Sequence, residues 1–483
     1  MNIKLLVRAF GILLIVISFF MIFPIIVAVA YGEREMIPNF IYPIVVMLAI
    51  GLGIYLFMPY PERRFFSPRD GFFFVSFSWL IVSSFSAIPF FTSRAIPRYV
   101  DAFFETMSGY TTTGASILTD IEALPKSMLF WRSLTHWLGG MGIVVLTVAI
   151  LPLLGVGGLQ LLKAEAPGPT VEKISPKIGE TAKKLWLIYL GISIAEVVLL
   201  YIGRMNLFDA LTHTFGTLAT GGFSPKNKSV GHYNSAYIDG VVTAFMILAG
   251  MNFSLYSRLL SGDIKPVLRN TELKAYLGIF ITASFFIAIW NFSRTYDSLG
   301  TSLRYAFFQA ASILTTTGFT TTNYEKWPAL SRTVLFVLMF IGGCSGSTGG
   351  GIKVVRIVTL FKQGWKELKY QIYPNAVFQV RMDGRVVSAD VIHSIFGFAF
   401  LYIFLILLTT LIVSTSGVGI KTSLATALVT LGNIGPGFGR IGPAGNYSFY
   451  PDFIKWYLSI IMMIGRLEVY TVLVLFTPTF WKR

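Results

Sequence analysis

The sequence YAFFQAASILTTTG, residues 305–318, joins about three turns of helix-compatible residues to a polar hairpin that ends in Gly318. Similar segments occur at three other places, each within apolar surroundings. The four hairpins are Thr111-Thr112-Thr113-Gly114, Ala219-Thr220-Gly221-Gly222, Thr315-Thr316-Thr317-Gly318 and Leu431-Gly432-Asn433-Ile434-Gly435. Thirteen residues before each last glycine lie the expected helix starts, Asp101, Asp209, Tyr305 and Thr422. This repeat in register predicts four equivalent structural units.

The composition is that of a membrane protein. Hydrophobic residues make up 54% of the 483 residues and charged residues only 13%, compared with roughly 25% charged residues in soluble domains. The mean hydropathy is +0.68. The one cysteine, Cys344, allows no disulfide within a single chain. We therefore expect the chain to fold in a lipid bilayer.

The net charge of +16 comes from basic residues beside the ends of apolar segments. They gather around residues 63–69, 163–184, 258–274, 353–369 and 482–483. Cytoplasmic loops of membrane proteins retain Lys and Arg in this way, whereas a nucleic-acid-binding protein concentrates them in one patch. The pattern predicts that both termini face the cytoplasm and that nucleic acid is not a partner.

Apolar segments of about 20 residues, enough to cross a hydrocarbon core of roughly 30 Å, place the membrane spans. Residues 9–31 and 40–59 form an N-terminal helix pair, and the first segment is too long for a removable signal peptide. Units of span, half-length helix with hairpin, and span follow at about 72–153, 184–258, 275–362 and 392–478. The sequence thus predicts an all-α polytopic membrane protein with ten full and four half crossings, in which four pseudo-symmetric span/pore-loop/span repeats surround one central pore.

This layout divides the chain into five parts. They are residues 1–60 for the N-terminal helix pair, 61–160 for the first pore repeat, 161–262 for the second, 263–376 for the third and 377–483 for the fourth. The hairpins enter and leave on the side opposite the basic clusters, so they are re-entrant. Re-entrant backbone is tolerated only inside protein or along a water-filled cavity.

The hairpins carry the groups that a dehydrated cation needs. Backbone carbonyl oxygens replace the water around a cation in a selectivity filter, and the required positive φ angles favour glycine. Threonine hydroxyls add oxygen ligands or brace the loop. The candidate filter residues are Thr112, Thr113, Gly114, Thr220, Gly221, Gly222, Thr316, Thr317, Gly318, Asn433, Ile434 and Gly435. Ion ligands are expected at Thr112, Thr113, Thr220, Gly221, Thr316, Thr317, Asn433 and Ile434.

The chemistry of these donors favours a monovalent alkali cation, because Ca²⁺ and Mg²⁺ sites usually recruit carboxylates. Each half-helix directs its negative end toward the cation, and Asp101 and Asp209 suit the N-caps of their half-helices. A single Thr/Gly run is also ordinary close-packing material in membrane helices. Four runs at the same spacing favour a selectivity filter over ordinary helix packing.

A second periodic feature lies in the span after each hairpin. The segments are Leu138-Gly139-Gly140-Met141, Leu248-Ala249-Gly250-Met251, Ile341-Gly342-Gly343-Cys344 and Met463-Ile464-Gly465-Arg466. A guanidinium costs at least a few kcal/mol at the centre of a bilayer, so Arg466 must face water or a partner, and in a cation pathway it would be an electrostatic barrier. The alternative is that Arg466 joins helices and is neutralised by a carboxylate outside the pore. Glu468 is expected to point elsewhere and to pair with another basic or polar group.

The second span of the third repeat is interrupted by residues 342–351, of which six are glycine. Each glycine costs about 1 kcal/mol in a helix relative to alanine, so the span must open into a loop. Just below the filter, this loop is expected to be a gate, formed by Gly346, Ser347, Thr348, Gly349, Gly350 and Gly351 together with Lys353 and Arg466. Lys353 follows Ile352 and not glycine, so the phosphate-binding motif is absent and no nucleotide is expected on this chain.

These residues together resemble the Trk/Ktr/HKT superfamily, in particular its bacterial Trk-type potassium-uptake membrane subunits. The resemblance covers essentially the whole chain and is carried by Thr-Thr-Thr-Gly-Phe at 315–319, by Asn433-Ile434-Gly435-Pro436-Gly437 and by the loop at 342–351. It implies potassium as the transported ion and a multi-pass protein of the bacterial inner membrane. It also implies a homodimer with one pore per subunit and cytosolic nucleotide-binding regulatory subunits.

The resemblance extends to selectivity. Gly114 matches the potassium-selecting pattern, since a serine at this place accompanies sodium permeation in the family. Each repeat has a single filter glycine and lacks the TVGYG sequence of tetrameric potassium channels, which implies looser discrimination against sodium.

Three other classes of function are an enzyme, a secondary transporter and a scaffold. An enzyme is not expected, because the histidines lack metal-ligand spacing and no nucleophile arrangement accompanies them; they are His136, His213, His232 and His393. The serious alternative is a secondary transporter that couples potassium to protons or sodium without a continuous pore. Such transporters commonly contain inverted repeats, whereas each repeat here starts from the same side. A scaffold would leave the four hairpin glycines replaceable.

Overall fold

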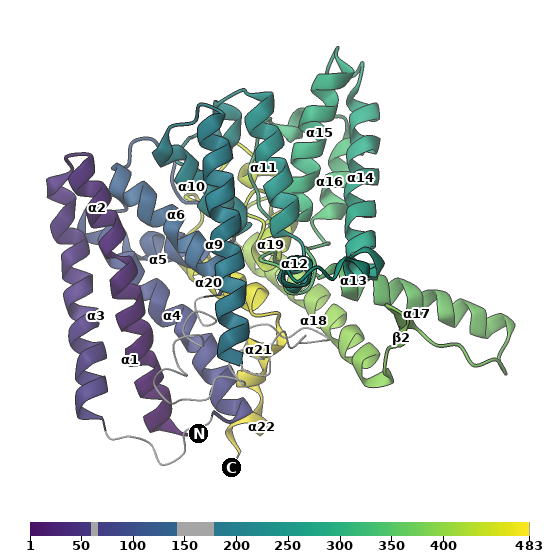
Figure 1. Ribbon diagram of the computed structural model, residues 1–483, viewed down its shortest axis with the longest axis horizontal. Coiled ribbons are helices and arrows are strands. Elements are labelled where there is room, and N and C mark those ends of the chain that lie inside the picture. Colours follow the sequence, from purple (N-terminus) through teal and green to yellow (C-terminus); the bar gives the residue numbers. More distant parts are fainter. Residues whose placement is uncertain (59–65, 143–177, 483) are drawn as a thin grey trace.

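The computed structural model describes residues 1–58, 66–142 and 178–482, and these fold almost entirely into helices (Figure 1). Some features proposed from the sequence lie outside the described residues. They are the divisions at 60/61 and 160/161, the basic residues at 63–64, 163–177 and 483, and the end of the expected span at 128–153. The two labelled chain ends lie at the same end of the molecule in Figure 1.

The predicted N-terminal helix pair is present as two long apolar arms. Its elements are α1 (Ile3–Phe20), α2 (Ile22–Ala30), the 3-10 turn η1 (Arg34–Met36) and α3 (Ile37–Phe57). The arms approach closely at two glycines, since a Cβ on Gly51 would lie 2.7 Å from the carbonyl oxygen of Gly11. Small residues allow this kind of backbone approach between membrane helices.

Four units follow, each with a long first helix, a short helix and a second helix. The first unit contains α4 (Pro68–Thr92), α5 (Tyr99–Tyr110) and α6 (Lys126–Gly140). The second contains α9 (Ile178–Ile202), α10 (Leu207–Leu218), η3 (Ser229–His232), α11 (Ala236–Ala249), α12 (Phe253–Leu260) and α13 (Ile264–Arg269). The third contains α14 (Thr271–Asn291), α15 (Leu299–Leu314), η4 (Tyr324–Lys326), α16 (Ala329–Leu338) and α17 (Val354–Ile372). The fourth contains α18 (Ala389–Ser414), α19 (Ile420–Gly432), η5 (Gly439–Ile441), α20 (Asp452–Arg466), α21 (Tyr470–Leu473), η6 (Val474–Phe476) and α22 (Pro478–Trp481).

Within the described residues, six helical segments are long and apolar enough to cross a membrane, or eight if each of two bent helix pairs counts as one span. The bends measure 94° between α11 and α12, and 114° between α20 and the segment α21–η6. The described residues therefore hold fewer than the ten full crossings expected from the sequence, and the expected span at 128–153 lies partly outside them. As far as the chain is described, each unit has one straight span, and its second helix is short or bent.

The second helices stop at the recurring glycine segments. They end at or near Gly140, Gly250, Gly342 and Gly465. The sequence predicted an interruption only in the third unit, so the uninterrupted spans expected in the second and fourth units are wrong. In the first, third and fourth units, glycines of these segments lie where another backbone comes too near for a side chain, whereas a Cβ on Gly250 would overlap the hydroxyl of Tyr276. A Cβ on Gly139 would overlap the carbonyl oxygen of Tyr110, and a Cβ on Gly465 would overlap that of Leu431.

Three of the short helices end where the sequence predicted, α19 ends two residues later, and all four begin earlier than predicted. Their last residues are Tyr110, Leu218, Leu314 and Gly432. The largest difference is in the third unit, where α15 begins at Leu299 and not at Tyr305. Its additional first turn is tied to α14 by a hydrogen bond of 2.7 Å from Ser302 Oγ to the carbonyl oxygen of Ala288.

The expected N-caps of two short helices are also wrong by about one turn. The N-cap of α10 is Asn206, whose side chain accepts a hydrogen bond of 2.8 Å from the backbone N–H of Asp209. The N-cap of α5 is Arg98. Asp101 and Asp209 instead lie in the first turn, where a negative charge still favours the positive end of the helix.

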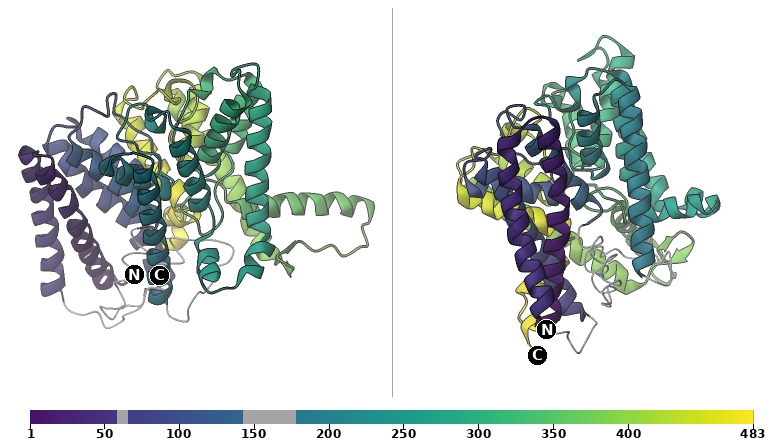
Figure 2. Two further views of the ribbon diagram at one scale, coloured as in Figure 1. Left: turned by 45° about the horizontal axis from the view of Figure 1, so that its top comes forward. Right: turned by 60° about the vertical axis from the view of Figure 1, so that its left-hand side comes forward.

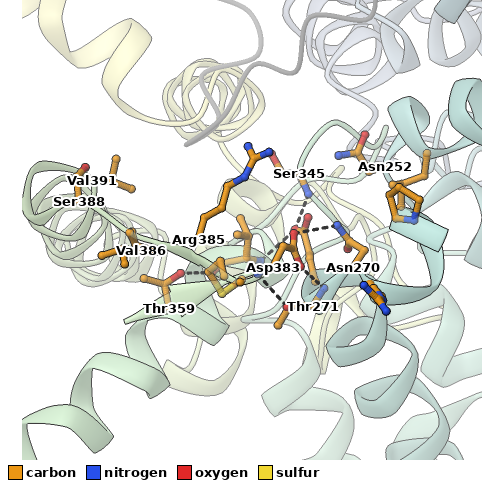
Figure 3. A pocket seen from close by; sticks show the side chains of 18 of the residues that line it. Asn252, Asn270, Thr271, Ser345, Thr359, Asp383, Arg385, Val386, Ser388 and Val391 are labelled. Atoms are coloured by element: carbon orange, nitrogen blue, oxygen red, sulfur yellow. Dashed lines mark hydrogen bonds between the residues drawn. The ribbon is translucent and has the colours of Figure 1, made fainter. Parts of the chain in front are cut away.

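Helix α17 extends away from the bundle, and a short hairpin follows it (Figures 1 and 2). Strand β1 (Arg381–Met382) pairs antiparallel with β2 (Arg385–Val386), with Arg381 opposite Val386 and Met382 opposite Arg385. The hairpin borders a pocket whose other walls include parts of α13, α14 and α17 (Figure 3).

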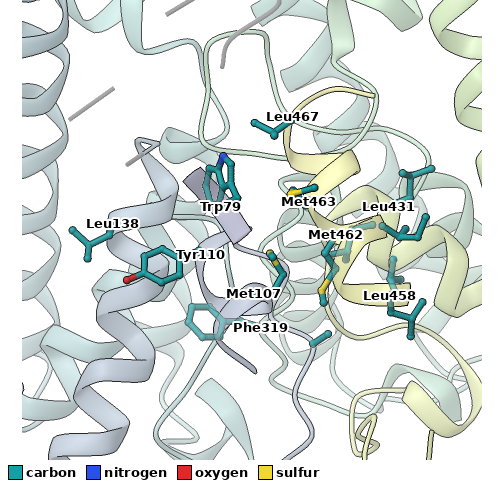
Figure 4. Close-up of a cluster of buried hydrophobic side chains, with 14 of the residues drawn as sticks. Trp79, Met107, Tyr110, Leu138, Phe319, Leu431, Leu458, Met462, Met463 and Leu467 are labelled. Atoms are coloured by element: carbon teal, nitrogen blue, oxygen red, sulfur yellow. The ribbon is translucent and has the colours of Figure 1, made fainter. Parts of the chain in front are cut away.

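Buried side chains from the first and fourth units pack around the ends of α5 and α19 (Figure 4). Tyr110 and Leu431 at these helix ends are fully buried, as are Trp79 of α4 and Met462 of α20. Because Tyr110 directly precedes the first hairpin and Leu431 is the first residue of the fourth, two of the four hairpins start from a tightly packed base.

Candidate functional site

The four hairpins share one backbone conformation. Their last glycines have positive φ angles, which are 77° at Gly114, 80° at Gly222, 84° at Gly318 and 90° at Gly435. Two residues earlier φ is positive again, at 53° for Thr112, 53° for Thr220, 60° for Thr316 and 54° for Asn433. Residues other than glycine rarely adopt this region. The recurrence of the same pair of unusual angles makes the four loops structurally equivalent.

The glycines close a ring. A Cβ on Gly114 would overlap the carbonyl oxygen of Gly221, one on Gly222 that of Thr317, and one on Gly318 that of Ile434. A Cβ on Gly435 would lie 2.6 Å from the carbonyl oxygen of Thr113. Each glycine thus abuts the carbonyl of the residue before the glycine in the next unit, in the order first, second, third, fourth and back to first.

Most threonine hydroxyls of the candidate filter make contacts within the protein. The Oγ1 atoms of Thr111 and Thr113 lie 2.8 Å apart. Asn433 Nδ2 donates to Thr113 Oγ1 at 2.9 Å and so links the fourth unit to the first. Thr112 differs, because its buried Oγ1 has no hydrogen-bond partner among the described residues. The hydroxyl of Thr113 therefore braces the loops.

A buried ion pair lies behind the first hairpin. Arg132 Nε donates to Glu105 Oε1 at 2.7 Å, and both side chains are at most 2% exposed. Glu105 also accepts from Ser116 Oγ at 2.8 Å and from the backbone N–H of Ile117 at 2.9 Å, just after the hairpin. Arg132 lies 3.5 Å from the ring centroid of Phe223, which follows the second hairpin. The pair holds two adjacent loops, and the sequence analysis missed it.

His136 supports the same two loops. Its Nδ1 lies 2.6 Å from the carbonyl oxygen of Gly109, at the end of the first short helix. Its ring stacks on Phe223 with centroids 4.0 Å apart, and a Cβ on Gly221 would lie 2.6 Å from the ring. The sequence analysis considered this histidine only as a catalytic candidate. In the structure it packs directly against the second hairpin.

Asp209 organises the outer end of the second short helix. It accepts hydrogen bonds from Asn206 Nδ2 at 2.8 Å and from the hydroxyl of Tyr233 at 2.7 Å, and Lys226 lies 3.8 Å away. Burial and the hydrogen bond to this carboxylate raise the pKa of Tyr233, which lies in the loop after η3. The phenol therefore stays a proton donor at physiological pH.

The glycine-rich loop of the third unit attaches to the break in the second unit. The backbone N–H of Cys344 donates to the carbonyl oxygen of Gly250 at 2.8 Å, and Phe253 donates to the carbonyl of Gly346 at 3.0 Å. The loop also reaches a hairpin, because the backbone N–H of Gly350 donates to Thr316 Oγ1 at 2.7 Å. It therefore lies directly against the hairpin ring, as the sequence predicted.

Arg466 connects three units at this level. Its Nη1 donates to the carbonyl oxygen of Thr348 at 2.6 Å. Its Nη2 donates to the carbonyl oxygens of Gly139 at 2.6 Å and Gly140 at 2.7 Å. Thr348 in turn donates from Oγ1 to the carbonyl oxygen of Ala249 at 3.2 Å. Arg466, the loop and the breaks of the first and second units thus form one hydrogen-bonded layer.

The remaining charged residues near the loop are paired within the protein. Lys353 Nζ donates to the carbonyl oxygen of Gly349. Arg356 forms an ion pair with Glu468 and lies 4.0 Å from the ring centroid of Phe398. The prediction that Glu468 pairs with another basic group is confirmed. The structure therefore brings the predicted gate residues into one cluster.

Glu272, at the start of α14, holds both ends of the loop. Its Oε1 accepts from the backbone N–H groups of Ser345 at 2.7 Å and Val355 at 3.0 Å. The sequence analysis missed this residue, although a carboxylate in the first turn of an apolar helix is a recognisable signal. Glu272 thus adds to the backbone bonds that join the two ends of the loop, such as the one of 2.8 Å from the N–H of Gly342 to the carbonyl oxygen of Ile352.

A protein-family model described as "TrkH: Cation transport protein" matches residues 37–483 of the chain. Among curated proteins, the chain is 41% identical to the Trk system potassium uptake protein TrkH of Salmonella typhimurium over 491 residues, with 100% of both chains covered. It is 36% identical to the Trk system potassium uptake protein TrkG of Escherichia coli, with 98% of this chain and 97% of the relative covered.

The similarity to a solved structure agrees with these sequence similarities. The fold is similar to that of the potassium transporter TrkH from Vibrio parahaemolyticus, determined by crystallography, with a TM-score of 0.89 and 35% sequence identity. The match covers 100% of both chains. The predicted helical, polytopic fold class is confirmed by this likeness.

Proposed function

Because the chain belongs to the TrkH family of cation transport proteins, we propose that it takes up potassium across the bacterial inner membrane through the ring of four hairpins. The observation that carries the proposal is the closed contact of each hairpin glycine with a carbonyl of the next unit. These contacts support the proposal because each unit contributes a main-chain oxygen beside the glycine of its neighbour. A ring of such oxygens is the arrangement that replaces the hydration shell of an alkali cation.

The ion is proposed to meet successive layers of carbonyl oxygens. They belong to the last glycines, to the residues before them, and to the residues with positive φ two positions before the glycines. The last two layers are Thr113, Gly221, Thr317 and Ile434, and then Thr112, Thr220, Thr316 and Asn433. The carbonyl ends of α5, α10, α15 and α19 lie directly before the hairpins and add a favourable negative potential.

The glycine-rich loop and Arg466 are proposed to form the gate. The loop is tied to the second unit through Cys344 and to the third hairpin through Gly350. Arg466 ties it to the first and fourth units and places a positive charge in this layer. A cation that leaves the hairpin ring would meet both the loop backbone and this charge. Opening then requires these bonds to break.

A second copy of the chain is the proposed partner at α17. Phe361, Trp365, Leu368 and Ile372 follow a helical spacing on this helix and are 77%, 65%, 61% and 70% exposed. A stripe of this kind on a projecting helix is self-complementary across a twofold axis. Membership in the family further suggests cytosolic nucleotide-binding regulatory subunits as partners, with both termini of this chain in the cytoplasm.

Ion flux into vesicles tests the proposed function. Purified protein in liposomes should accumulate radioactive rubidium, a potassium substitute, and external potassium should compete with it. Gly222→Ala should abolish the uptake, because its φ is 80° and a Cβ would overlap the carbonyl of Thr317. Gly191→Ala in α9 is the matched control, since nothing lies within 4 Å of its Cβ position. Equal uptake by both variants would refute the proposal that ions pass through the ring of hairpins.

A further inference from the structure

A cavity of about 1170 Å³ lies beside the gate, among α12, α13, the start of α14, the start of α17 and the β1–β2 hairpin (Figure 3). Ser345 of the glycine-rich loop and Glu272, which holds that loop, are among its lining residues. The cavity therefore shares a wall with the proposed gate. Nothing in the mechanism described above uses it.

Three arginines from three different elements line this cavity. They are Arg258 of α12, Arg269 of α13 and Arg385 of β2. In Figure 3 the side chain of Arg385 extends toward the part of the cavity where Ser345 lies. Arginine side chains bind phosphate through charge-assisted hydrogen bonds, so a cavity lined by arginines from separate elements is suited to a phosphate group.

The two acidic lining residues are engaged with backbone donors of the protein. Glu272 accepts from the N–H groups of Ser345 and Val355. Asp383 accepts from the backbone N–H of Thr271 at 2.6 Å. Three arginines therefore share the lining with two carboxylates whose oxygens already accept from backbone N–H groups, and the lining carries a net positive charge. The cavity is therefore suited to an anion.

The surface next to the cavity is apolar and exposed. Leu260 at the end of α12 and Ile264 and Leu268 of α13 are 79%, 53% and 66% exposed. Lys265 and Arg269 alternate with them on the same short helix. Exposed apolar residues beside basic ones are typical of segments that lie in a membrane interface. A lipid can place its acyl chains against this surface while its headgroup enters the cavity.

We propose that this cavity binds the phosphate group of an anionic phospholipid from the cytoplasmic leaflet and thereby stabilises the closed gate. Basic pockets between membrane helices on the cytoplasmic side are suited to such headgroups. A phosphate held by both Arg269 and Arg385 joins α13 to the hairpin. Asp383 of that hairpin is bonded to Thr271, next to Glu272, so the lipid reinforces the position from which Glu272 holds the loop. The effect on the gate rests on the proposed function, whereas lipid binding does not.

Native mass spectrometry of the full chain in detergent tests the binding. The probe is phosphatidylglycerol, with phosphatidylcholine and inorganic phosphate as comparisons. The double variant Arg269→Gln/Arg385→Gln should bind phosphatidylglycerol about thirtyfold more weakly, as expected for two arginines near a headgroup. Lys265→Gln is the matched control, since Lys265 is exposed on the same helix but does not line the cavity, and it should bind as the wild type does.

Different results of these experiments would overturn the site, the lipid as its occupant, or the effect on the gate. Unchanged binding by the double variant overturns the site, and displacement of phosphatidylglycerol by millimolar phosphate overturns a lipid as its occupant. Rubidium flux in phosphatidylcholine vesicles, with and without phosphatidylglycerol, tests the gate. The wild type should leak less when phosphatidylglycerol is present, and the double variant should not respond. Absence of flux in every lipid would contradict the proposed function and leave the binding result standing, while flux that ignores phosphatidylglycerol would overturn the regulation.

Discussion

The guanidinium of Arg466 donates a hydrogen bond of 2.6 Å to the carbonyl oxygen of Thr348, at the centre of the glycine-rich loop. The second nitrogen of the same guanidinium bonds Gly139 and Gly140 at the end of α6. One side chain therefore fixes the loop to the unit on its far side and brings a positive charge to the same place. Loop position and charge are coupled at this residue.

Arg466→Ala should raise rubidium flux in liposomes. The substitution removes both the charge and three hydrogen bonds, and lowering a barrier by about 1.4 kcal/mol raises a rate about tenfold. Arg466→Lys keeps the charge but loses the planar guanidinium, whose two terminal nitrogens donate these hydrogen bonds. It should therefore give an intermediate flux. Unchanged or reduced flux in folded Arg466→Ala would contradict the proposal that Arg466 is a barrier to cations.

Glu272→Ala should also increase the flux. Alanine has no oxygen to accept from the two backbone N–H groups that Glu272 Oε1 holds, and a buried donor left without an acceptor costs about 1–3 kcal/mol. The loop should then be held less firmly. Asp263→Ala, at an exposed position before α13, is the control. An equal response of both variants would show that Glu272 does not anchor a gate.

Gly114→Ser should reduce the preference for potassium over sodium. A side chain here would overlap the carbonyl of Gly221, so the ring must widen or twist at this point. The φ of 77° adds strain of about 1–2 kcal/mol. Competition of sodium with rubidium uptake measures the change. Gly278→Ser, where nothing lies within 4 Å of the Cβ position, should retain the selectivity of the wild type.

Two ion pairs should differ sharply in their contribution to stability. Glu105→Gln breaks a pair that is at most 2% exposed, and uncompensated burial of the remaining charge costs about 3–5 kcal/mol. Asp452→Asn breaks an ion pair in which the side chains of Arg98 and Asp452 are 55% and 47% exposed. This change should lower the free energy of unfolding by less than about 1 kcal/mol. Thermal unfolding in detergent compares them. Similar losses would mean that the buried pair does not support the hairpins.

The hairpins could be predicted because their requirements are local. A glycine with positive φ, reached after a fixed length of helix, leaves a mark in the sequence that repeats at Gly114, Gly222, Gly318 and Gly435. These features depend on spacing and residue type alone.

The breaks in the second and fourth units could not be predicted in the same way. A single glycine such as Gly250 or Gly465 costs only about 1 kcal/mol inside a helix, so the local sequence permits a continuous span. The chain bends because distant groups take over its backbone bonds, as when Cys344 donates to the carbonyl of Gly250. The roles of Glu105 and Glu272 likewise depend on partners far away in the sequence.

The reversal potential of the current in a planar bilayer tests the central claim most directly. With Arg466→Ala protein, a tenfold potassium gradient, equal pH and an impermeant anion, the current should reverse at about 59 mV, the value set by potassium alone. A superimposed proton gradient should move this value little, since potassium is proposed to pass the hairpin ring by diffusion and without coupling to protons. A reversal potential that follows the proton gradient, or the absence of any potassium current, would contradict the account.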